Sequence, residues 1–220
     1  MKIRHTCLAA ALAAISTAAL ADGNQMYVRG GTMGVGVGYA TALSERINAR
    51  VGFNYFDYSR DQTYDDNRYG ADLKFSSIEA LADVYLAGGF RLTGGAIYSA
   101  NKVDLTARLG PGGSFTLNGN TYVGINSASA VVDLGRKRVA PYIGIGYSSR
   151  PNGGSGFGFY FDAGIVHQSP QATISIDADP LVTSDPTFQA NKAQEEGKLR
   201  DSVSSASNWP VVMVGMSYTF

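Results

Sequence analysis

Alternation of apolar residues with glycine, at a period of two, is the feature that most restricts how this chain can fold. In residues 30–39, GGTMGVGVGY, one parity carries Met33, Val35, Val37 and Tyr39, and glycine fills most positions of the other. Successive side chains of a strand point to opposite faces, so the stretch predicts a strand with one apolar and one nearly bare face. A dinucleotide-binding loop would instead have to open a helix. A glycine face suits a narrow interior that inward side chains must share.

The same alternation recurs along the chain. Strands are predicted at about 33–43, 46–58, 71–85, 89–101, 137–149, 156–169 and 208–220. Aromatic residues stand near the ends of the apolar faces, and such faces, about 9–12 residues long, are typical of transmembrane β-strands. In a soluble β-sandwich the polar face should be rich in Lys, Glu and Thr, whereas here it is rich in Gly, Asn and Ser. The pattern favours an all-β, transmembrane, antiparallel up-and-down barrel.

The connections between these segments alternate between short and long, as in bacterial outer-membrane barrels. Long extracellular loops are predicted around residues 57–72, 101–136 and 169–207. Single-chain bacterial barrels have even strand numbers, so an eighth strand is expected at residues 24–30. In the segment 71–85 the apolar parity changes, which predicts a β-bulge at Ser76-Ser77.

Two of the long connections contain signals for ordered structure. Asn118-Gly119 in FTLNGNTY predicts a type I′ hairpin that pairs Thr116 with Thr121. Residues 186–204 predict a helix that begins after an Asp185 N-cap with proline at its first position, and this loop is expected to fold over the barrel mouth.

Residues 1–21 are expected to be a signal peptide that precedes a single barrel domain at 22–220. Lys2 and Arg4 precede an apolar run too short to span a membrane, and Ala19-Leu20-Ala21 resembles a cleavage site. Residues 22–220 hold 16 Lys and Arg against 18 Asp and Glu, a net charge of −2, and no cysteine. This charge gives no basis for nucleic-acid binding.

The carboxyl end predicts an assembly signal. Phe220 and Tyr218 share the apolar parity of the last predicted strand. A terminal phenylalanine of this kind resembles the signal that the barrel-assembly machinery of the outer membrane reads, so the cell outer membrane is the expected location.

By parity, three charges of each sign are expected inside the barrel. They are Arg50, Lys74, Arg91, Glu79, Asp83 and Asp162. A barrel of eight strands is just wide enough for its side chains, and buried charges must be paired, so a salt-bridged plug is the simpler reading. The alternative is a polar path along which the two charged ends of a zwitterion find partners.

The chain resembles the CarO type of outer-membrane proteins, named for ornithine uptake and carbapenem susceptibility. The resemblance rests on NKVDLTARLG and FTLNGNTY, on VAPYIGIGY, on FYFDAGIVHQSPQATISI, and on WPVVMVGMSYTF. It implies a monomeric eight-stranded barrel with elaborate outer loops, and a narrow uptake channel for small amino acids or similar zwitterions. A closed structural or adhesion barrel is the alternative. Outer-membrane lipid and lipopolysaccharide are the expected surroundings.

Catalysis is a weaker alternative. His167 and Ser169 share the outward face at the outer end of a predicted strand, and some small barrels with such a pair modify lipid A. No orienting acid accompanies the pair, so the chain is not expected to be an enzyme. Asp61, Asp65, Asp66 and Asp72 lack the spacing of a calcium loop, and neither a metal nor a cofactor is expected.

Overall fold

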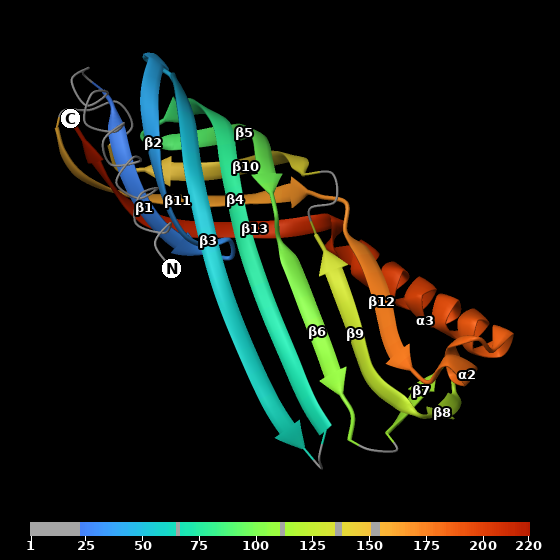
Figure 1. Cartoon of the computed structure of the whole chain (residues 1–220). Coiled ribbons are helices and arrows are strands. Elements are labelled where there is room, and N and C mark those ends of the chain that lie inside the picture. Colours follow the sequence, from blue (N-terminus) through green and yellow to red (C-terminus); the bar gives the residue numbers. More distant parts are fainter. Residues whose placement is uncertain (1–22, 65–66, 111–112, 135–137, 151–154) are drawn as a thin grey trace.

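The protein is an antiparallel β-barrel closed by hydrogen bonds around a ring of eight strands (Figure 1). The computed structural model describes residues 23–64, 67–110, 113–134, 138–150 and 155–220. In ring order the strands are β1 (Gln25–Gly31), β2 (Gly34–Ser44), β3 (Ile47–Tyr64), β4 (Asn67–Ala87), β5 (Phe90–Ser99), β10 (Val139–Ser148), β11 (Gly156–His167) and β13 (Asn208–Thr219). Pairing of β1 with β13 closes the ring. The predicted barrel, its eighth strand near the amino end included, is confirmed.

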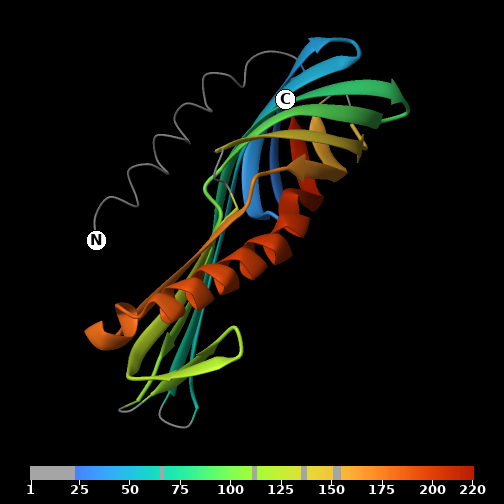
Figure 2. The same ribbon diagram turned by 90° about the vertical axis from the view of Figure 1, so that its right-hand side faces the viewer.

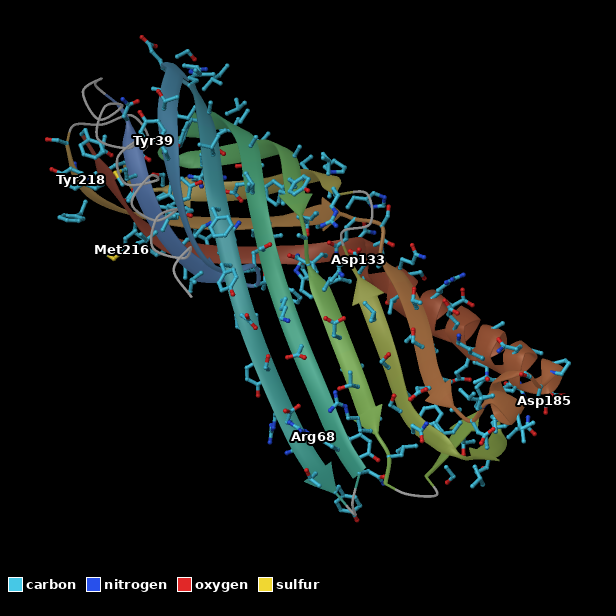
Figure 3. All side chains as sticks on the ribbon, viewed as in Figure 1. Tyr39, Arg68, Asp133, Asp185, Met216 and Tyr218 are labelled. Atoms are coloured by element: carbon cyan, nitrogen blue, oxygen red, sulfur yellow. The ribbon has the colours of Figure 1, made fainter. Side chains whose placement is uncertain are left out.

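The outward face of the ring is apolar and its inward face is polar. Large exposed apolar side chains on the outside include Val28, Val37, Val51, Phe53, Ile78, Leu92, Ile143, Ile145, Phe159, Ile165, Val214 and Met216. Figure 3 shows Met216 and Tyr218 pointing away from the barrel. At the end with the short turns, the Phe157 ring packs against Tyr218, with 5.0 Å between ring centroids. An apolar outside around a polar inside is the arrangement that a barrel needs in lipid.

Among the described residues, no helix is both long enough and apolar enough to span a membrane. The predicted signal peptide, 1–21, lies outside the described residues.

Beyond the ring, the sheet continues into a second part, which we call the outer sheet. It consists of residues 56–64 of β3, residues 67–76 of β4, and the strands β6 (Lys102–Arg108), β9 (Ile125–Asp133) and β12 (Gln171–Ala178). β3 and β4 therefore belong to the barrel wall and to the outer sheet at once (Figure 1). Two of the three segments predicted as loops are thus largely strands, and the third, residues 169–207, contributes β12 and then continues in helices.

One face of the outer sheet is covered by helices and a hairpin. These are α2 (Pro180–Thr183), α3 (Pro186–Ser204), the 3-10 helix η1 (Ser205–Ser207), and the hairpin of β7 (Ser114–Leu117) and β8 (Asn120–Val123). The Asp185 carboxylate caps α3 by accepting from the Thr187 backbone N–H at 2.7 Å. Asn118 and Gly119 take the positive φ angles, 49° and 81°, of the predicted turn. Both local predictions are confirmed.

The position predicted for the helical loop was wrong. Most of α3 lies along the outer sheet beside β12, not across the barrel opening (Figure 2). Leu199 and Val203 pack there against an apolar cluster that contains Val132 and Ala172.

The predicted bulge at Ser76-Ser77 is absent, because β3 and β4 pair without a register shift from Tyr64 and Asn67 down to Ile47 and Val84. The apolar parity changes for another reason. Within the ring, Ile78 faces outward. In the outer sheet, Phe75 has the inward parity, and its ring centroid lies 6.1 Å from that of Trp209, beneath the helices that cover the sheet. The apolar side of β4 therefore changes because its surroundings change, from lipid around the barrel to a covering layer on the outer sheet.

Candidate functional sites in the lumen and the outer sheet

Glycines of the inward faces make room for large aromatic rings inside the barrel. A Cβ atom at Gly38 would overlap the ring of Tyr27, and one at Gly52 would lie 2.7 Å from the Tyr27 hydroxyl. Gly144 and Gly164 stand in the same relation to Tyr142. Because bulky side chains occupy the interior at some positions, the neighbouring inward positions on the same and adjacent strands must contribute almost nothing there.

The centre of the lumen is a four-membered ion network. Asp162 accepts from Arg50 Nη1 at 2.7 Å and from Arg91 Nη2 at 2.6 Å. Asp83 lies 2.9 Å from Arg50 Nε and 3.3 Å from Arg91 Nε, and accepts from the Thr93 hydroxyl at 2.6 Å. All four charged side chains are at least 96% buried. Each carboxylate thus bridges two guanidinium groups that come from different strands.

A second ion pair lies beside this network. Arg29 pairs with Glu79, donates to Asn54 Oδ1 at 2.9 Å, and stacks 5.5 Å from the centre of the Tyr27 ring. The Tyr27 hydroxyl in turn donates to Glu79 Oε1 at 3.2 Å. Arg29 was not among the charges predicted for the lumen. It lies two residues after Tyr27 on β1 and therefore shares its inward face, which was a sufficient signal.

Lys74 does not lie in the lumen, which corrects the sequence-based prediction. The last rung that β4 shares with β5 is Ser77 with Ser99, so Lys74 belongs to the outer sheet. It is exposed there, opposite Lys102. With Arg29 in its place, the described lumen holds three cations and three carboxylates.

Little space is left inside the barrel. Towards the outer sheet, an apolar cluster fills the section, with Ile97, Val166 and Met213 among its members. The cavity beside the central network measures about 10 Å³. That is roughly the space for one water molecule.

In the described structure the side-chain partner of His167 is Asn208, not Ser169. His167 Nδ1 lies 2.9 Å from Asn208 Oδ1, on the neighbouring strand, and no hydrogen bond joins the imidazole to Ser169. The described residues also contain no group of three or more His, Cys, Asp or Glu side chains placed to hold a metal ion.

A second candidate site, which we call the outer pocket, lies between the outer sheet and its covering layer. Its volume is about 620 Å³. The sheet side is formed by Arg60, Tyr69, Ala71, Leu105, Ala107, Ala128, Ala130 and Ile174, and the covering side by Phe115, Leu117, Glu195, Lys198, Leu199 and Ser202. The volume falls within the roughly 300–1,000 Å³ of ordinary ligand sites. No sequence pattern pointed to it.

The predicted assembly signal lies at the seam of the barrel. The Phe220 backbone N–H donates to the Asn24 carbonyl at 3.0 Å, and the Phe220 ring packs 5.2 Å from that of Tyr218. The hydrogen bond joins the two ends of the described chain.

Deletion of Phe220 is expected to lower the amount of assembled barrel in the membrane far more than Leu181→Ala, which changes an exposed residue of α2. The deletion removes both the seam contact and the predicted signal. Fractionation of expressing cells, followed by heat-modifiable gel migration, measures the assembled fraction. Equal assembly of the two variants would contradict the signal.

The ring, the apolar outside and the polar, ion-paired inside define a membrane-spanning β-barrel. No family model and no curated protein matches the sequence. Among solved structures, CarO2 of Acinetobacter baumannii superposes with a TM-score of 0.58 at 20% identity, over 90% of this chain and 98% of that one. CarO of the same organism gives 0.58 at 18% identity, over 92% and 99%. The chain therefore has the fold of the CarO-type outer-membrane barrels, as the resemblance implied.

Proposed function

We propose that this protein is an outer-membrane barrel that does not conduct solutes, and that its barrel anchors the outer sheet as a binding surface outside the cell. The observation that carries the proposal is the filled lumen. The cavity beside the central ion network, about 10 Å³, is far smaller than an amino acid. The apolar outer wall and the CarO-type fold support the membrane location.

The ion network also supports a closed lumen. A zwitterion that crossed the barrel would need a free cation and a free carboxylate on the way. Arg50 and Arg91 already share Asp83 and Asp162, and Arg29 is paired with Glu79. Separating buried pairs is expensive, because each group would lose its partner in a medium of low dielectric constant. The uptake channel would require these pairs to part.

The outer sheet offers what the lumen does not, a cavity of ligand size. β3 and β4 hold it to the barrel through unbroken pairing. The two parts are therefore expected to have different tasks, with the barrel holding the chain in the membrane and the outer sheet carrying the binding site.

Purified protein in planar bilayers is expected to show no discrete conductance steps, and liposomes that contain it should not swell in glycine or ornithine. The reason is that the described lumen is occupied by the ion network and by large side chains, with a cavity of only about 10 Å³ beside the network. Heat-modifiable gel migration should first confirm that the barrel is folded, and a general porin in the same preparation gives the positive control. Amino-acid swelling above that of empty liposomes would refute the closed barrel and favour uptake.

A further inference from the structure

The outer pocket is an unfilled section between two well-packed ones. Towards the barrel, Phe75, Val132 and Ala172 form a cluster with Leu199 and Val203 of α3. Towards the far end, Leu117 and Ile125 form another cluster with Phe188. The pocket of about 620 Å³ lies between them. Protein interiors rarely leave voids much larger than a water molecule. The space is therefore unusual: the outer sheet and its covering layer are packed together at both ends of the pocket but stay apart between them.

Residue size explains the space. One rung of the outer sheet runs from Arg60 on β3 through Ala71, Leu105 and Ala130 to Ile174 on β12. All five residues line the pocket. Alanine at two of these positions leaves space above the sheet, and the Leu105 side chain between them is 46% exposed.

The roof is held by its own contacts and does not depend on filling the space below. Lys198 Nζ donates to Asn118 Oδ1 at 2.7 Å, and the Asn118 side-chain amide donates to Gln194 Oε1 at 2.6 Å. Asn191 donates to the Tyr122 hydroxyl at 2.7 Å. The turn of the β7–β8 hairpin is thereby tied to one face of α3.

One end of the rung is charged. Among the described residues, the exposed ion pairs are Arg68 with Asp61, Lys198 with Glu195 and Arg200 with Glu196, and Arg60 takes part in none of them. The Lys198 charge on the roof is balanced by Glu195 at 3.4 Å. The pocket thus joins an apolar floor to Arg60, a cation that forms no ion pair with another described residue.

We propose that the outer pocket binds a free long-chain fatty acid, with its carboxylate at Arg60 and its chain along the rung towards Ile174. The inference rests on the proposed function, in which the outer sheet carries the binding site. Four strand spacings separate β3 from β12, about 19 Å, which suits a long chain better than a short one. A guanidinium group matches a carboxylate in geometry and in charge.

A free fatty acid fits better than the acyl chain of a membrane lipid. The rung crosses β4 at Ala71, six residues beyond Ser77, the last residue that β4 pairs with the barrel strand β5. At the usual rise per residue this is about 20 Å along the strand. A chain anchored in the bilayer would have to leave it to reach the pocket.

The test uses the full barrel in lipid nanodiscs and palmitate that carries a photoactivatable diazirine near its methyl end. Irradiation followed by peptide mass spectrometry should place the label on β9, β12 or α3. Arg60→Gln is expected to lower labelling at sub-saturating palmitate about tenfold, as for loss of a hydrogen bond to a charged group. Arg68→Gln is the matched control, because Arg68 lies on the same hairpin with the opposite parity and should leave labelling unchanged.

A second pair of variants tests the pocket without touching the charge. Ala130→Trp should block labelling, whereas Val131→Trp, one residue along and on the opposite face, should not. Three results would each overturn the proposal: equal effects of Arg60→Gln and Arg68→Gln, competition by hexadecanol as strong as by palmitate, or label confined to the outward barrel face.

Conductance of the same samples separates the fatty-acid proposal from the closed-barrel proposal. Silent bilayers without labelling would reject the fatty acid alone, and conducting bilayers with labelling would reject the closed barrel alone.

Discussion

Asp162→Ala is expected to destabilise the folded barrel by about 3–5 kcal/mol. The carboxylate bridges Arg50 and Arg91 at 2.7 and 2.6 Å, and its side chain is 98% buried. Without it, two guanidinium groups must share Asp83 in a water-poor interior. The loss is large because the remaining charges stay buried when their partner is removed. Urea unfolding of the detergent-solubilised barrel, followed by heat-modifiable gel migration, measures the change.

The matched control for Asp162 is a carboxylate of the outer sheet. Asp61 pairs with Arg68 at 2.7 Å, but its side chain is 60% exposed. Asp61→Ala should therefore cost about 0–1 kcal/mol. In a double-mutant cycle, Asp162→Asn combined with Arg91→Gln should cost less than the sum of the two single changes. Strict additivity would mean that these side chains do not meet.

Gly38→Val is expected to be strongly destabilising although valine favours strands, by about 1–3 kcal/mol or more. A Cβ at this position would overlap the Tyr27 ring and lie 2.5 Å from the Val51 carbonyl oxygen. Displacing Tyr27 would also break its hydrogen bond to Glu79. The same unfolding assay gives the free-energy change.

Gly30→Val provides the comparison, because a Cβ there meets nothing within 4 Å. This outward variant should be neutral or mildly stabilising. If the Tyr27 ring is the obstacle, Gly38→Val should cost less in a Tyr27→Ala background than in the native one. The same cost in both backgrounds would show that Tyr27 is not the obstacle.

The barrel was predictable because its information is local. Odd and even positions within each segment separate the lipid side from the lumen side. On β11, Phe157 and Phe161 have the outward parity and Gly158 and Asp162 the inward parity, and the structure places these residues accordingly. Asn118-Gly119 and Asp185-Pro186 also act over a few residues, through the φ angles and the cap that they favour.

The outer sheet was not predictable in the same way. β6 and β12 both pair with β9, across sequence distances that no turn signal marks. Without that sheet, the parity change near Ser76 suggested a bulge, and Lys74 seemed to point into the lumen. Both errors have one origin. The environment around β4 changes along the strand, from lipid and lumen to water and a covering helix, and parity alone does not report such a change.

The outer pocket could not be predicted at all. It depends on how far α3 and the β7–β8 hairpin stand from the sheet, and the alanines of its floor are ordinary strand residues in the sequence. Arg60 resembles any other charge of an exposed loop until the rung to Ile174 is known.

Closure of the ring between the first and last strands has a consequence for folding kinetics. β1 and β13 pair residues nearly a full chain length apart, as in Gln25 with Thr219. Such distant contacts form late, because the entropy of closing a long loop must be overcome first. Arg29 on β1 and Asp162 on β11 can meet their partners on β4 and β3 only when the cylinder is nearly complete. The lumen charges should therefore slow unfolding more than they speed folding, and their main contribution is to the lifetime of the folded barrel.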